Sequence, residues 1–235
     1  MYIRRVLKRV AGLIVVAAAA AAARPAFAQL PEQPQPAAEP RLGVDLGVQF
    51  GFALFQGRIN ESIPLVLNDA LFSMVPLIVD AGYRADDRIA VGLRFQYGIV
   101  QLREAGGGEA CGPGVDCRGS ATAVAAHVTA HLPVSTLFVP WLRLGGGYEW
   151  LRMQLTGDFR GAPADIDVRF RGWTFGLAEV GADGALLPQF AVGPFVGVSV
   201  GRYNFGSDSD TPEKPLVYKR VHEWVMFGLR GVFSL

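Results

Sequence analysis

The sequence is poor in cysteine, histidine and charge. Its 235 residues include two cysteines and three histidines, and 18% of them are charged. Two cysteines cannot supply the bridges of a disulfide-stapled scaffold or the four ligands of a structural zinc site. The first 28 residues hold five basic and no acidic side chains, so the rest of the chain carries 17 basic against 21 acidic residues. A nucleic-acid-binding protein needs the opposite sign. We therefore expect no nucleic-acid partner.

The amino terminus has the three parts of a secretory signal. Residues 1–9 are basic, residues 11–23 are apolar, and small residues at Ala26 and Ala28 suit a signal peptidase. We predict a signal peptide over 1–28. A membrane anchor is the alternative, but the apolar run is shorter than the ~20 residues of a spanning helix. Residues 29–41 contain four prolines and few apolar side chains, which predicts an extended periplasmic leader.

From Leu42 to Leu235 the sequence alternates between apolar and small or polar residues. A strand sends successive side chains to opposite faces, so this period of two predicts strands with one apolar face. Glycine is frequent on the other face. The pattern recurs and predicts eight strands, at 42–54, 72–83, 87–102, 119–132, 138–154, 168–183, 189–205 and 221–235. The second strand contains Pro76 and alternates poorly, and the sixth slips phase near 178–180, which suggests a bulge.

The predicted connections alternate in length along the chain. Those near 84–86, 133–137 and 184–188 are short, whereas four others are long and rich in Gly, Asp and Arg. The long connections are 57–71, 103–118, 155–167 and 206–220. Antiparallel strands with long loops at one end and tight turns at the other are typical of outer-membrane barrels. We predict an all-β, eight-stranded, antiparallel up-and-down transmembrane barrel over 42–235.

A secreted, lipocalin-like soluble barrel is the alternative fold. Its outer face would carry Lys, Glu and Thr, whereas here the less apolar face is mostly Gly, Ala and Ser with scattered charges. Small residues suit the narrow lumen of eight strands, and the apolar face then contacts lipid. Aromatic residues near the strand ends predict interfacial girdles. They are Trp141, Tyr148, Trp150, Trp173, Tyr203, Phe205, Trp224 and Phe233, of which Trp224 falls on the lumen face.

This architecture resembles the small eight-stranded outer-membrane proteins of the OmpA, OmpX and OmpW group. The resemblance covers nearly all of the chain after the signal peptide but contains no diagnostic short motif. It implies a Gram-negative outer membrane, with lipid and lipopolysaccharide around the barrel and the barrel-assembly machinery as a folding partner. It also implies long loops on the outside, and we expect a monomer without a cofactor. The expected role is structural, surface-interacting or that of a narrow pore.

Five charged residues fall on the predicted lumen face of four strands: Asp45, Arg94, Arg143, Glu149 and Arg230. Opposite charges in a narrow, poorly solvated lumen are expected to pair. Such a network either plugs the barrel or forms a charged constriction for small solutes, because rings of charge set pore selectivity. Glu179 joins it if the phase slip is real.

The remaining reactive residues favour no catalytic or metal site. His127 and His131 lie ~13 Å apart on a strand, too far to share one ion. Cys111 and Cys117 are predicted to form a disulfide in an oxidising compartment. Asp208, Asp210 and Glu213 are interpreted as an ordinary solvated loop, with calcium as the alternative. An enzyme acting on lipid or peptide at the outer rim remains an alternative function, with His222, Glu223 and Ser207 or Ser209 as its nearest candidate residues.

Overall fold

A computed structural model describes residues 43–57, 71–102, 115–132, 138–159, 162–209, 211–217 and 220–235. Within these ranges it contains nine strands. They are β1 (Gly43–Gly57), β2 (Leu71–Arg84), β3 (Ile89–Leu102), β4 (Val115–His131), β5 (Phe138–Phe159), β6 (Ala162–Leu187), β7 (Phe190–Ser207), β8 (Lys214–Pro215) and β9 (Val221–Ser234). Among the described residues, no helix combines the length and apolarity needed to cross a membrane. The proposed signal peptide and leader lie outside these ranges.

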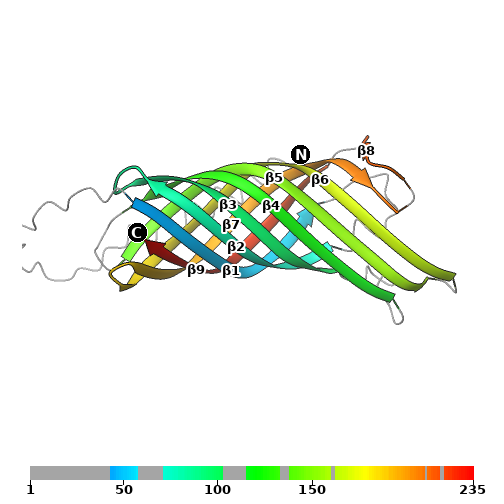
Figure 1. Cartoon of the computed structure of the whole chain (residues 1–235), viewed down its shortest axis with the longest axis horizontal. Coiled ribbons are helices and arrows are strands. Elements are labelled where there is room, and N and C mark those ends of the chain that lie inside the picture. Colours follow the sequence, from blue (N-terminus) through cyan, green and yellow to red (C-terminus); the bar gives the residue numbers. More distant parts are fainter. Residues whose placement is uncertain are drawn as a thin grey trace, which may run out of the picture. The chain divides into compact units, whose positions relative to one another are not determined.

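Eight of the strands close into a barrel (Figure 1). Each neighbouring pair from β1 to β7 is antiparallel, β9 pairs with both β1 and β7, and the β6–β7 pairing completes the ring. Among the described residues, the two-residue β8 pairs only with Phe205 and Gly206, near the end of β7. This ring is the predicted eight-stranded antiparallel barrel. Closure matters in lipid because an open sheet would leave backbone groups without partners.

The two faces of the sheet are assigned by exposure. Leu46, Phe50 and Leu93 are 46%, 57% and 65% exposed, whereas Arg94 and Arg230 are each 3% exposed. Apolar side chains therefore point outward and charged ones inward, as the alternation predicts. A barrel with an apolar exterior and a polar interior has the arrangement of a membrane-spanning protein.

The predicted loop 155–167 is wrong, because most of it is strand. β5 and β6 continue as an antiparallel hairpin, and Thr156 pairs with Asp165 within it. Leu155, one residue beyond the predicted strand end, is still buried. The hairpin extends well past the other strand ends at the side of the barrel that carries β8 (Figure 1).

β6 contains the predicted bulge, a few residues earlier than expected. Its register with β7 shifts between Thr174 and Gly176. Thr174 faces inward before the shift, and Leu177 and Glu179 face inward after it. The shift therefore turns Glu179 into the lumen. In β2, Pro76 pairs with Gly98 of β3. The pairing of β2 with β1 passes from Leu77 to Met74 and gives Pro76 no partner, which suits proline because it has no N–H to donate.

Candidate functional site

Three arginines and three carboxylates form the central network of the lumen. Arg143 donates to Asp80 at 2.8 Å and to Glu179 at 3.4 Å. Arg94 also pairs with Glu179. Arg230 donates to Asp183, completing a set in which positive and negative charges are equal in number. All six side chains are 9% exposed or less, so the charges are compensated inside the barrel rather than by bulk water.

Two of these ion pairs, Arg94–Glu179 and Arg143–Asp80, cross the lumen rather than follow its wall. β3, which carries Arg94, is separated from β6, which carries Glu179, by two intervening strands. The same is true of β5 with Arg143 and β2 with Asp80. An eight-stranded lumen is narrow enough for one side chain from each wall to meet its opposite. The network therefore occupies the middle of the barrel.

Trp141 supports this network from inside, which corrects its predicted place in the lipid-facing girdle. Its indole N–H donates to Asp183 at 3.0 Å, and the guanidinium of Arg230 lies 4.6 Å from its ring centroid. The side chain is 2% exposed. It shares the inward parity of Arg143 on β5, so the aromatic residue near a strand end faces the charges rather than lipid.

Glu149 belongs to a second lumen cluster. Its carboxylate accepts hydrogen bonds from the hydroxyl of Tyr203 and the indole N–H of Trp224, the latter at 3.1 Å. His222 Nε2 lies 3.4 Å from the other carboxylate oxygen, and its ring stacks on Tyr203 with centroids 4.2 Å apart. Tyr203 is fully buried, so its predicted girdle position is wrong. This cluster also explains the lumen position of Trp224, which supplies a hydrogen bond.

The five predicted lumen residues thus fall into three groups. Arg94 and Arg143 share Glu179. The Arg230–Asp183 pair adjoins them through Trp141, whose ring centroid lies 4.6 Å from the guanidinium of Arg230 and 5.5 Å from that of Arg143. Glu149 belongs to the second cluster. Asp45 belongs to neither cluster. It lies near the start of β1, where it accepts hydrogen bonds from Arg84 and Ser234. Asp80 and Asp183 were not among the predicted lumen residues. β2 alternates too poorly to show which face Asp80 occupies, and the bulge in β6 changes which residues after it face the lumen, Asp183 among them.

The other candidate residues lie in different surroundings. His127 and His131 face the lumen and are 5% and 6% exposed. Within the described part of the chain, no group of three His, Cys, Asp or Glu side chains could hold a metal ion. Cys117 lies on β4, but Cys111 falls outside the described residues, so the disulfide stays a prediction.

The residues of the candidate enzyme set have different partners. His222 contacts Glu149, whereas Ser209 donates to the carbonyl of Asp165 and accepts from the N–H of Asp167. In the last loop, Glu213 pairs with Arg171 and Asp208 accepts from the N–H of Thr211. Asp210 lies outside the described residues.

The outward face of the β5–β6 hairpin carries a cluster of arginines, which we call the outer arginine cluster: Arg152, Arg169 and Arg171. Their side chains are 47%, 61% and 45% exposed. Arg152 and Arg169 both donate two hydrogen bonds to the carboxylate of Asp167. Those bonds lower the pKa of Asp167 from 3.8 to about 2, so this carboxylate remains charged at neutral pH. These arginines fall within the predicted strands 138–154 and 168–183, but only charges on the predicted lumen face were expected to form a site.

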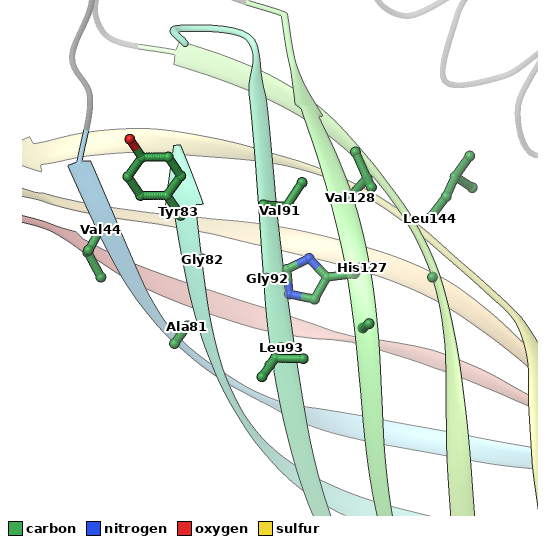
Figure 2. A pocket seen from close by; sticks show the side chains of 12 residues that line it. Val44, Ala81, Gly82, Tyr83, Val91, Gly92, Leu93, His127, Val128 and Leu144 are labelled. Atoms are coloured by element: carbon green, nitrogen blue, oxygen red, sulfur yellow. The ribbon is translucent and has the colours of Figure 1, made fainter. Parts of the chain in front are cut away.

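A separate groove of about 720 Å³ lies on the apolar outside of the barrel. Figure 2 shows Tyr83, Val91 and Leu93 along it. The His127 ring lies directly behind Gly92 (Figure 2). Most of the groove lining belongs to the apolar outward face of the barrel.

No family model matches the sequence, and no curated protein matches it. Solved structures of small outer-membrane barrels do. A major outer-membrane protein of Thermus thermophilus matches with a TM-score of 0.49 and 12% identity, over 82% of this chain and 99% of that one. Neisserial surface protein A matches with 0.46 and 12%, over 82% and 97%. The outer-membrane protein AlkL, solved in lipid bilayers, matches with 0.46 and 16%, over 88% and 98%.

Proposed function

We propose that this protein is a closed barrel of a bacterial outer membrane, with a structural or surface-interaction role and no standing pore. The observation that carries the proposal is the central network, in which Arg94 and Arg143 reach carboxylates on the far side of the lumen. A water-filled channel needs a continuous path along its axis. Buried ion pairs that join opposite walls obstruct that path.

The network is also costly to open. Removing one member of a buried ion pair leaves an uncompensated charge in a poorly solvated space, which costs about 3–5 kcal/mol. A transient opening must separate both cross-lumen pairs, because Arg143 holds Asp80 while Arg94 holds Glu179. This favours a permanent plug over a gate that opens readily.

The outer membrane is the location that best fits the exterior. Large apolar side chains cover the outside along several strands, and aqueous exposure of such a surface would be unfavourable. Tyr148, Trp150 and Trp173 pack edge to face on that exterior, with centroids 4.8 Å and 5.1 Å apart. Aromatic groups of this kind are typical of the membrane–water interface. The same features count against a soluble barrel.

Conductance in planar lipid bilayers tests the closed lumen. We expect the wild-type protein to insert without stable single-channel currents, and the variant R94A/R143A/E179A to conduct because its cross-lumen bonds are gone. Arg152→Ala is the matched control, since its charge lies on the outside, and it should remain silent. Stable currents from the wild-type protein would contradict the proposal and support a narrow pore.

Gel mobility before and after boiling tests the barrel itself. A folded membrane barrel resists the detergent of the gel, so the unboiled protein should migrate differently from the heat-unfolded one. The same measurement establishes whether each lumen variant still folds before its conductance is interpreted. Identical mobility of boiled and unboiled wild-type protein, refolded in detergent, would count against a membrane barrel.

A further inference from the structure

The outer arginine cluster lies immediately beyond an aromatic belt on the same face. Tyr148 pairs with Trp173 across β5 and β6, and the next outward-facing pair is Trp150 with Arg171. Arg152 and Arg169 form the pair after that. Successive outward pairs along a strand are ~7 Å apart. The arginines therefore begin where the aromatic belt ends, at the depth where lipid headgroups meet water.

The cluster surrounds a hollow of about 420 Å³ with both polar and apolar walls. Its three guanidinium groups lie together with the rings of Trp150 and Phe205. The guanidinium of Arg171 is 5.0 Å from the Phe205 ring centroid, which holds it at the border between the apolar and polar walls. A ligand here meets cations on one side and aromatic surface on the other.

The charges in the hollow do not cancel. Arg152 and Arg169 share the single carboxylate of Asp167, and Arg171 pairs with Glu213, so three cations face two anions. Arginine has five N–H donors, and Arg152 and Arg169 each use two of their N–H-bearing nitrogens on Asp167. The planar guanidinium group suits phosphate because it can donate two parallel hydrogen bonds.

We propose that the outer arginine cluster binds the phosphate groups of an outer-leaflet glycolipid of the lipopolysaccharide class. The sugar-phosphate headgroup lies against Arg152, Arg169 and Arg171, and the apolar part of the lipid continues down past Trp150 and Phe205. This inference rests on the proposed outer-membrane location. It assigns a lipid-contact site to the outside of the β5–β6 hairpin, separate from the charged lumen.

Native mass spectrometry of the full chain in detergent tests the site, with diphosphorylated lipid A as the probe. We expect the wild-type protein to retain one lipid A molecule, and the variant R152Q/R169Q/R171Q to bind it about tenfold more weakly or worse, since several charge-assisted hydrogen bonds are lost. Arg118→Gln is the matched control, because Arg118 is an exposed arginine of the neighbouring strand that pairs with Asp116. It should bind as the wild-type protein does.

Two further measurements keep the test decisive. The wild-type protein should prefer diphosphorylated over dephosphorylated lipid A, a comparison that needs no variant. Millimolar inorganic phosphate should compete weakly, because it lacks the acyl part; full displacement by phosphate alone would mean a free-anion site and overturn the lipid assignment. Equal retention of both lipid A forms, or equal binding by the triple variant and Arg118→Gln, would overturn the proposal. If lipid A binding fails in this way while the wild-type protein still shows heat-dependent gel mobility, the lipid-site proposal is overturned and the proposed function is not.

Discussion

The guanidinium of Arg143 on β5 donates to the carboxylate of Asp80 on β2 across the lumen, with a nitrogen–oxygen distance of 2.8 Å. The two side chains are 1% and 4% exposed. Arg143 also donates to Glu179 on β6 and to the hydroxyl of Thr129 on β4. One arginine therefore ties three other strands of the barrel together, and its loss is the most direct test of what the network contributes.

Arg143→Ala should lower the free energy of unfolding by about 3–5 kcal/mol, because it leaves Asp80 buried without its principal partner. Urea unfolding in lipid vesicles, followed by tryptophan fluorescence, measures the change. Arg118→Ala is the control and should cost less than about 1 kcal/mol, because its ion pair is exposed. The double variant R143M/D80N should recover part of the loss. Equal effects of Arg143→Ala and Arg118→Ala would show that the central network contributes nothing to stability.

Gly92→Ala should destabilise the barrel by about 1–3 kcal/mol through overpacking. A Cβ atom at Gly92 would lie 2.6 Å from the carbonyl oxygen of Ala81 and 2.7 Å from a ring carbon of His127. Its cross-strand neighbour Gly82 is the control, since a Cβ there would come no closer than 3.5 Å to any atom. Gly82→Ala should change stability by about 0.5 kcal/mol or less. The prediction fails if both variants unfold at the same urea concentration.

Leu93→Arg should lower the free energy of unfolding in vesicles by about 2–4 kcal/mol, because it puts a charge against lipid on the outside of β3. Leu93 is 65% exposed and lies between Val91 and Phe95 on the apolar face. Val217→Arg is the control, because Val217 is 82% exposed in the segment after β8 and lies outside the strands of the barrel. Its substitution should be close to neutral. A larger loss for Val217→Arg than for Leu93→Arg would contradict the assigned exterior.

The contacts of Asp167 should depend on pH only in strong acid. Hydrogen bonds from Arg152 and Arg169 lower its pKa from 3.8 to about 2 in the folded protein. The stabilisation they give is therefore complete above pH 3.8 and is lost as the pH falls through about 2. The carboxyl carbon chemical shift of Asp167, followed by NMR during an acid titration, reports this pKa. In R152Q/R169Q the midpoint should move back toward 3.8, and an unchanged midpoint would exclude the arginines as its cause.

Much of the barrel could be predicted because its determinants are local. The alternation around Leu46 and Phe50 assigns β1 its two faces, and the same period places Arg94 and Arg230 inside. The second strand was harder, since Pro76 and its apolar neighbours obscure which face Asp80 occupies. The inward direction of Asp183 could not be predicted for a different reason. A bulge between Thr174 and Gly176 reverses the faces, and its position depends on pairing with neighbouring strands.

The aromatic residues show the limit of reasoning from strand ends alone. Trp150 and Trp173 lie on the exterior, 41% and 60% exposed, as expected for a girdle. Trp141 and Tyr203 have similar positions near strand ends but point inward, where each donates a hydrogen bond to a buried carboxylate. A position near the end of a strand suggests the membrane–water interface. Only the direction of the side chain decides whether the aromatic ring contacts lipid or faces the lumen.

Consecutive residues alone specify the number of barrel strands, their order and the separation of an apolar outside from a polar inside, because a period of two is a local property of the chain. Which charges meet depends instead on the folded ring. Arg143 and Asp80 are 63 residues apart, and their contact requires the closure of the barrel, the stagger of its strands and the narrowness of its lumen. Those quantities arise from all eight strands pairing together, so no single stretch of sequence contains them.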